Sequence, residues 1–258
     1  MEYTNVRVEK RLKQSTLRAA NTRTDLTGSP VKNLVLLSIP DREYNLIRRH
    51  LEPVDLPHHL VLHETGEKIQ FAYFLNDGLA SFVISTTDGR SVEVAIAGRE
   101  GVIGTPLAVG LNRGPYRAIM QIPGGGLRIK SAAVDGVLKD VPELRLILNR
   151  YVLIQGLQIA QIAACNRLHE IEQRLARWLL MCQDRVNSDS LPVTHELLAQ
   201  MLGTGRPSVS LAAGMLQRAG MIENLRGTVK ILDRKNLEVA ACECYRAMQH
   251  FKGGLVIG

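Results

Sequence analysis

The chain has 258 residues, and its 45% hydrophobic and 22% charged side chains are ordinary for a globular protein of one large or two smaller domains. No apolar run reaches the roughly 18 residues that a membrane-spanning helix needs, and the N-terminus lacks the apolar segment of a signal peptide. We therefore expect a cytoplasmic protein without a membrane partner. Its net charge of +7 favours a polyanionic partner.

The first half of the chain reads as a tail followed by a β-domain. Residues 1–33 are polar and basic without periodicity, which predicts a flexible tail. Residues 34–136 hold a short helix at 41–51 and then strands separated by turn residues, predicted at 59–64, 70–75, 80–85, 91–97, 117–122 and 126–129. Asp88 and Gly89 between two of these strands are a strong hairpin signal. We expect a compact sandwich or roll.

A long helix is predicted at residues 137–165, because one glycine and no proline interrupt about forty residues after Pro142. Its apolar residues form two stripes. The first consists of Leu144, Leu148, Tyr151, Ile162 and Cys165, and the second of Leu146, Leu153, Leu157, Ala160 and Ala164.

One stripe of this helix can cover the β-domain, and the other needs a partner, for which the same helix of a second subunit is the economical candidate. The alternative is one thick buried helix inside a monomer, because several glutamines interrupt the heptads. The stripe loses register near Asn166, where we place a hinge to a last domain at residues 166–250.

The last domain contains two short helices separated by a tight turn. Thr194 can N-cap the first helix and Gly203 can end it, while Pro207 fits the first turn of the second. Small residues lie where two steeply crossing helices must approach closely, which is typical of a helix-turn-helix. The alternative is a helical hairpin that merely packs.

The outer face of the second helix carries short or hydrogen-bonding groups that suit the major groove of duplex DNA. Two strands at 222–225 and 228–232 then form a wing, whose basic residues suit phosphates. The predicted DNA-binding residues are Thr194, Thr204, Arg206, Pro207, Ser208, Ser210, Leu211, Gln217, Arg226 and Lys230.

Residues 191–232 resemble the C-terminal domain of the Crp/Fnr superfamily, and the order of the domains extends the resemblance to residues 34–245. The resemblance implies an α+β fold with an N-terminal cyclic-nucleotide-binding-like β-roll that senses a signal, a long dimerisation helix and a C-terminal winged helix-turn-helix. It implies a homodimeric transcription regulator that is not an enzyme and reads a palindromic DNA site, with RNA polymerase as a further partner if it activates.

The resemblance also assigns roles to single positions. Arg206 stands where the family usually has a guanine-reading arginine, whereas Pro207 and Leu211 replace an acidic neighbour and a second basic reader. The half-site should therefore differ from the commonest family consensus.

The β-domain departs from the cyclic-nucleotide-binding members of the family. Thr105 follows Gly104 where those members have a ribose-binding glutamate, and Arg117 lacks the hydroxyl residue that follows the phosphate-binding arginine. Arg113 and Arg117 are candidates for another anion site, or are solvated loop residues. We expect an effector, if there is one, to be a small molecule other than a cyclic nucleotide, bound near these four residues.

The four cysteines all lie in the second half, so the N-terminal iron–sulfur cluster of some family members is excluded. Cys242 and Cys244 are spaced too tightly for the usual zinc pair, with no second ligand pair nearby in the sequence. We expect ordinary thiols, no metal and no cofactor.

Two other functions compete with the DNA-binding hypothesis. One is a small-molecule-binding regulatory module whose C-terminal domain contacts a protein partner. The other is an enzyme that holds an anionic substrate on Arg113 and Arg117, which the absence of a nearby acid, base or metal set disfavours.

Overall fold

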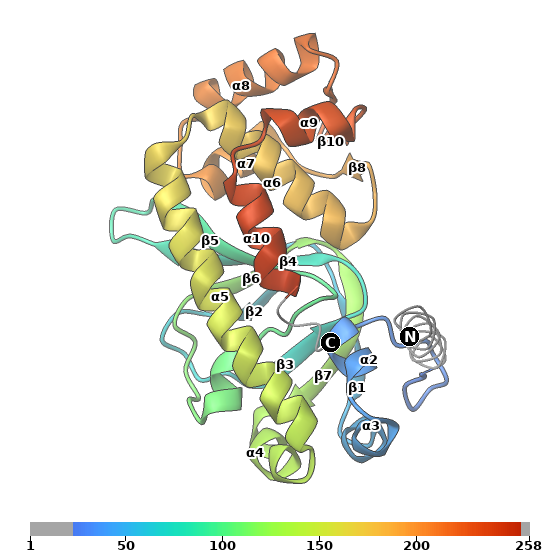
Figure 1. Cartoon of the computed structure of the whole chain (residues 1–258). Coiled ribbons are helices and arrows are strands. Elements are labelled where there is room, and N and C mark those ends of the chain that lie inside the picture. Colours follow the sequence, from blue (N-terminus) through green and yellow to red (C-terminus); the bar gives the residue numbers. More distant parts are fainter. Residues whose placement is uncertain (1–22, 254–258) are drawn as a thin grey trace, which may run out of the picture.

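The computed structural model describes residues 23–253, and the part of the predicted flexible tail up to residue 22 lies outside this range. Figure 1 shows a β-domain below, a long helix along one side and a mainly helical domain above. The expected α+β architecture is confirmed. No helix among the described residues is long and apolar enough to cross a membrane.

The β-domain is a roll of two antiparallel sheets. One sheet has the order β1-β7-β3, and the other has the order β2-β6-β4-β5. Their bounds are β1 Glu52–Leu56, β2 Val61–His63, β3 Phe71–Leu75, β4 Leu79–Ser85, β5 Ser91–Ala97, β6 Arg117–Ile122 and β7 Gly124–Lys130. The predicted hairpin around Asp88 and Gly89 joins β4 to β5. The prediction missed β1, whose Pro53 weakens the strand pattern and is tolerated because β1 is an edge strand.

The segment before the roll is packed against it, which differs from the flexible tail predicted for residues 1–33. Asn33 is fully buried, and its amide donates hydrogen bonds to the carbonyls of Leu75 and Gly101. Arg23 pairs with Asp41 at 2.7 Å. These contacts fasten residues 23–33 beside the short helices α2 (Leu34–Ser38) and α3 (Asp41–Arg48).

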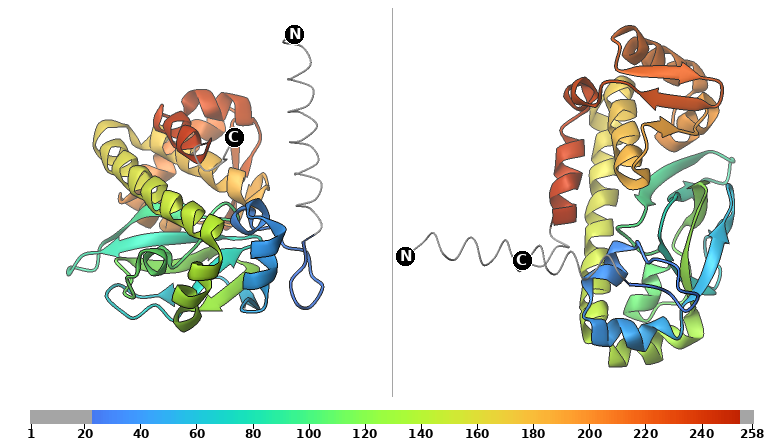
Figure 2. Two further views of the ribbon diagram at one scale, coloured as in Figure 1. Left: turned by 60° about the horizontal axis from the view of Figure 1, so that its bottom comes forward. Right: turned by 90° about the vertical axis from the view of Figure 1, so that its right-hand side faces the viewer.

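The predicted long helix is two helices, α4 (Ser131–Asp140) and α5 (Pro142–Leu168). They break at Val141 because Pro142 has no N–H to donate to the preceding turn, and it is tolerated only in the first turn of a new helix. The first apolar stripe of α5 is buried throughout. The second stripe is exposed: Leu146, Leu153 and Leu157 expose 41%, 66% and 42% of their surface. Figure 2 shows that the roll covers one side of α5 only.

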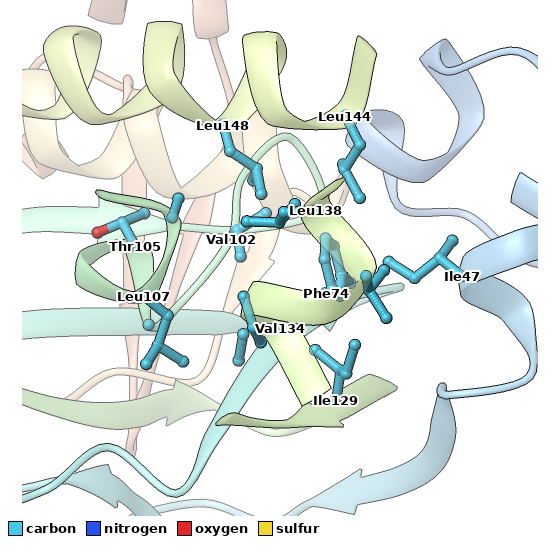
Figure 3. A pocket seen from close by; sticks show the side chains of 14 residues that line it. Ile47, Phe74, Val102, Thr105, Leu107, Ile129, Val134, Leu138, Leu144 and Leu148 are labelled. Carbon is cyan, nitrogen blue, oxygen red and sulfur yellow. The ribbon is translucent and has the colours of Figure 1, made fainter. Parts of the chain in front are cut away.

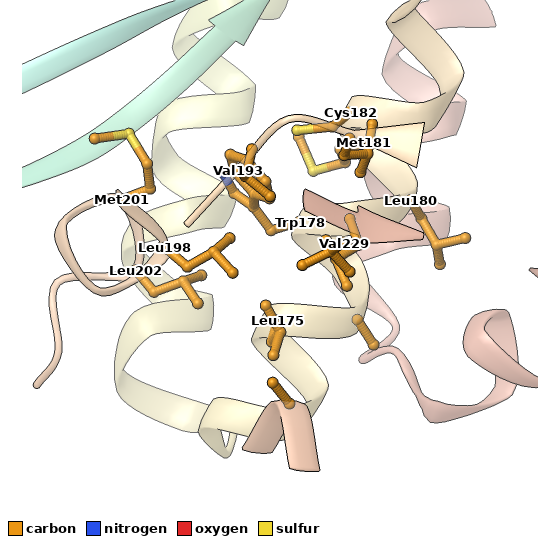
Figure 4. Close-up of a cluster of buried hydrophobic side chains, with 14 of the residues drawn as sticks. Leu175, Trp178, Leu180, Met181, Cys182, Val193, Leu198, Met201, Leu202 and Val229 are labelled. Carbon is orange, nitrogen blue, oxygen red and sulfur yellow. The ribbon is translucent and has the colours of Figure 1, made fainter. Parts of the chain in front are cut away.

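The C-terminal domain is built on α6 (Ile171–Val186), and the break between α5 and α6 lies close to the hinge predicted near Asn166. The following elements are β8 Ser190–Leu191, α7 His195–Leu202, α8 Arg206–Arg218, β9 Ile222–Leu225, β10 Thr228–Ile231, α9 Arg234–Ala240 and α10 Cys244–Gly253. Figure 4 shows leucines of α6 and α7 around Trp178, with Val229 of β10 closing the core. The three short strands pair in the order β8-β10-β9.

Two features join this domain to the rest of the molecule. Its hydrophobic core is continuous with the roll, because Leu79, Val83 and Ile96 belong to the same buried cluster as Trp178. Its last helix, α10, returns to pack along α5, on the side away from the roll (Figure 2, right).

Candidate nucleic-acid interface

The helix-turn-helix consists of α7 and α8. Thr194 caps α7, its hydroxyl accepting a hydrogen bond from the backbone N–H of Leu197 at 3.1 Å. Gly203 ends α7 with a φ of 59°, a left-handed conformation that favours glycine. Pro207 lies in the first turn of α8, as its missing N–H requires. The inner stripe of α8 is fully buried against α6 and α7 and consists of Val209, Ala212, Ala213 and Leu216.

The outer face of α8 is free of protein cover. The predicted residues on this helix are all exposed, namely Arg206, Pro207, Ser208, Ser210, Leu211 and Gln217. Leu211 exposes 65% of its surface. Thr204 lies half-buried in the turn before α8. The structure therefore brings the predicted residues to one surface.

The wing lies beside this face. β9 and β10 pair antiparallel where the wing was predicted, with the turn Arg226–Gly227 between them. Arg226 and Lys230 are exposed, and among the described residues neither they nor Arg206 form an ion pair. Three basic side chains are thus available to an external anion.

A hydrogen-bond network that sequence reasoning missed holds α7, α8 and the wing together. His195 contacts the Ser210 hydroxyl through Nδ1 at 3.0 Å and the Asn224 side chain through Nε2 at 3.2 Å. The Asn224 amide in turn donates to Oε1 of Gln217 at 2.8 Å. Ser210 and one end of Gln217 therefore fix the geometry of the surface as well as lining it. No periodicity marks these residues in the sequence, because the network joins positions 29 residues apart.

The roll contacts the helix-turn-helix domain through buried polar groups. The carboxyl group of Glu93 on β5 is buried and accepts a hydrogen bond from the Trp178 indole on α6 at 2.7 Å and another from Ser81. Arg185 of α6 pairs with Glu100 at 2.7 Å and is 1% exposed. Burial raises the pKa of Glu93 to about 7, against the opposing effect of its hydrogen bonds and of nearby Arg177 and Arg185.

The predicted effector residues divide into two groups. Gly104 has a φ of 91° at the start of the short helix η1 (Thr105–Val109), which is seated against α5. The Thr105 hydroxyl is buried and donates to Oε1 of Gln155 on α5 at 2.9 Å, and the Tyr116 hydroxyl donates to the same atom at 3.0 Å. The side-chain nitrogen of Gln155 is buried without a hydrogen-bond partner.

Arg113 and Arg117 do not join this cluster, so the structure does not bring the four predicted effector residues together. Ala118 and Met120 of β6 point into the roll, so the alternation of a strand directs Arg117 to the other face, where it pairs with Glu64 at 3.3 Å. Arg113 donates to the carbonyl of Gly66 at 2.7 Å in an exposed loop.

The space between η1, α4 and α5 is a small apolar cavity of about 20 Å³ (Figure 3). Leu144 and Leu148 of α5, Val134 and Leu138 of α4 and Leu107 of η1 point into it. This volume holds about one water molecule.

Comparison with known proteins agrees with this architecture. Residues 173–240 match the family of the Crp-like helix-turn-helix domain. FixK2 from Bradyrhizobium japonicum has a similar structure, with a TM-score of 0.63 and 14% identity over 74% of this chain and 98% of that one. A CRP-family transcriptional regulator from Thermus thermophilus gives 0.60 and 24% over 73% and 96%. The c-di-GMP-responsive regulator CLP of Xanthomonas campestris gives 0.62 and 15% over 74% and 99%. No curated protein matches the chain by sequence.

Residues 173–240 are a Crp-like helix-turn-helix domain, and the chain as a whole shares the fold of Crp/Fnr-family regulators. The resemblance inferred from the sequence is therefore confirmed.

The Glu93 carboxyl group predicts a pH dependence of stability. Because its folded pKa of about 7 lies above the ordinary value of 4.5, the protonated group stabilises the fold below pH 4.5, and this stabilisation is lost as pH rises through about 7. In Glu93→Gln, the uncharged amide can still accept a hydrogen bond from Trp178 and can donate one to the Ser81 hydroxyl. In urea unfolding from pH 5 to 8, the variant should gain stability relative to the wild type with rising pH, by at most about 3 kcal/mol. A difference that stays constant over this range would contradict the assignment.

Proposed function

We propose that the protein is a homodimer that reads a palindromic DNA site, with α8 of each subunit in the major groove and the wing on the flanking phosphates. The observation that carries this proposal is the exposed outer face of α8, with the exposed Arg206 at its start. Two recognition helices related by a two-fold axis would read half-sites about 34 Å apart.

The chemistry of this face assigns different tasks to its residues. The Arg206 guanidinium can donate two parallel hydrogen bonds to O6 and N7 of a guanine. Leu211 offers an apolar contact to a thymine methyl, and Ser208 can donate to a base edge or a phosphate. Arg226 and Lys230 on the wing carry charge without base-reading geometry, so their contacts fix position. Pro207 has no side-chain hydrogen-bond donor, so fewer residues of α8 can form polar contacts with base edges.

Dimerisation through α5 would cover its exposed stripe. Leu146, Leu153 and Leu157 lie at spacings of seven and four residues, with Ala160 and Ala164 continuing the same face. A stripe with this period suits a helix that pairs with a copy of itself. The small alanines allow close approach near the end of α5 that leads to the DNA-binding domain.

We infer that a cyclic nucleotide is not the effector. The cavity between η1 and α5 is too small for one, and Thr105 is already bound to Gln155. The unsatisfied side-chain nitrogen of Gln155 is instead a donor suited to a smaller acceptor-bearing ligand, or to a rearrangement of α5. If the protein activates transcription, RNA polymerase is its further partner.

Arg206→Ala should separate base reading from phosphate binding. We expect it to weaken binding to the selected palindrome by about 1–3 kcal/mol while leaving affinity for random duplex nearly unchanged, because one guanine contact is lost. Lys230→Ala should weaken both equally and reduce the salt slope by about 1. Fluorescence anisotropy at several salt concentrations measures both effects.

Arg246→Ala is the matched control, because it removes an equal charge from an exposed position on α10. It should leave both affinities almost unchanged. If Arg206→Ala behaved like this control, α8 would not read DNA in the proposed way, and a protein partner for the domain would become the better hypothesis.

The dimer interface can be tested with Leu157→Asp, which places a charge on the exposed stripe of α5. We expect a shift from dimer to monomer in sedimentation velocity, because the charge would be desolvated at the interface. Val239→Asp on α9 is the control, since Val239 is 76% exposed and lies outside the stripe. If the Leu157→Asp variant remained a dimer, the interface would lie elsewhere on the protein.

Cyclic nucleotides should change neither the melting temperature of the protein nor its affinity for the palindrome. A ligand that binds the folded state raises the melting temperature by mass action, so cyclic AMP, cyclic GMP and c-di-GMP can be compared in one thermal assay. Cognate duplex DNA serves as the positive control. A rise with cyclic AMP or cyclic GMP alone would show that the roll opens to admit a cyclic nucleotide.

A further inference from the structure

Three cysteines and a histidine from opposite ends of the C-terminal domain meet at the junction of α5, α6 and α10. Their ligand atoms, the sulfurs of Cys165, Cys242 and Cys244 and a ring nitrogen of His169, all lie within 4.8 Å of one another. The cysteines expose at most 3% of their surface. This corrects the expectation of no second ligand pair near Cys242 and Cys244, because the fold supplies one from α5.

Local structure explains why the two pairs converge. Cys165 lies in the last turn of α5, and the His169 backbone N–H still donates to the Cys165 carbonyl, so both side chains lie at the end of the helix. Cys244 is the first residue of α10, whereas Cys242 precedes the helix. The tight spacing of this pair is therefore accommodated by the change of backbone conformation at the start of α10.

We propose that these four residues bind a single Zn²⁺ ion in a closed tetrahedral Cys₃His site. Zinc binds sulfur at about 2.3 Å, so two thiolates on one tetrahedral ion lie about 3.8 Å apart. The sulfurs of Cys165 and Cys242 are 3.5 Å apart, and Nδ1 of His169 is 3.6 Å from the sulfur of Cys244. An iron–sulfur cluster distributes its protein ligands over two or more irons, so some of these ligands must lie farther apart than ligands of one ion do.

The surrounding groups match those of a metal site. The Glu243 carboxylate contacts Nε2 of His169 at 3.0 Å, which leaves Nδ1 as the free ligand nitrogen and orients the ring. Gln161 donates to the sulfur of Cys244 at 3.1 Å. Gln161 of α5 thus orients a ligand of the second pair, Cys244, and Glu243 orients a ligand of the first pair, His169.

The charge of the neighbourhood fits the same assignment. Three thiolates and one Zn²⁺ carry a net charge of −1, which is costly to bury without a cation nearby. The positive charge of Arg177 interacts electrostatically with the Cys165 sulfur. Arg177 is 3% exposed, and its Nε atom and that of Arg174 are buried without a hydrogen-bond partner.

The position of the site indicates that the ion would have a structural role. It would clip α10 to the end of α5, directly beside the turn into α6, and so fix the approach of the DNA-binding domain to the long helix. The ion would leave no open coordination position, which is typical of structural and not catalytic zinc. This inference does not depend on which DNA sequence α8 reads.

The test is metal analysis of the full-length protein, purified under reducing conditions. We expect about one zinc per chain, and after replacement by Co²⁺ the visible bands of a tetrahedral thiolate-rich site. Cys165→Ser and Cys242→Ser should lose the ion. Cys182→Ala is the matched control, because Cys182 is a buried cysteine of α6 outside the cluster. It should keep the ion.

A further variant distinguishes loss of the metal site from misfolding of the protein. Glu243 exposes 78% of its side chain, so Glu243→Gln should fold normally and yet weaken Zn²⁺ binding about 10–100-fold in a chelator competition. The proposal is overturned if the reduced wild type neither contains zinc nor gives the tetrahedral Co²⁺ spectrum. It is equally overturned if Cys165 and Cys242 form a disulfide and the reduced pair takes up no metal, which would make them a redox pair.

Discussion

The buried hydrogen bond between the Trp178 indole and the Glu93 carboxyl group is the contact on which the arrangement of the two domains depends. It joins α6 to β5 in the middle of one hydrophobic core that both domains share. A polar pair in such a place strongly favours one relative orientation, because any shift leaves a buried polar group unsatisfied. The recognition surface on α8 is consequently presented by a domain that is docked on the roll and not tethered to it by a linker.

The long helix α5 relates this contact to the rest of the molecule. One face of α5 closes the roll, and through Gln155 it reaches the buried hydroxyls of Thr105 and Tyr116. Its other face is an exposed leucine and alanine stripe, and its end carries two of the four clustered Cys and His side chains. A change within the roll that moved α5 would therefore act on the proposed subunit interface and on the helix-turn-helix domain at once.

Much of this could be predicted from local pattern. The helix-turn-helix, the β4–β5 hairpin and the two stripes of α5 follow from periodicity, capping residues and turn chemistry, which act over a few residues. The elements that prediction missed or misplaced depend on context. β1 was missed because its proline is tolerated only at a sheet edge, and a sequence pattern does not show which strand lies at the edge.

The sequence by itself determined the class of protein, because the helix-turn-helix and the wing are formed by one continuous segment. The spacing of apolar, capping and turn residues in that segment predicts how its elements pack. Only the tertiary structure decided which distant side chains meet. Strand alternation turned Arg117 away from Thr105, and the network from His195 to Gln217 formed across separate elements. The return of α10 brought Cys242 and Cys244 to Cys165 and His169, over 70 residues earlier in the chain. Such convergence depends on the packing of whole elements, which no local pattern reports.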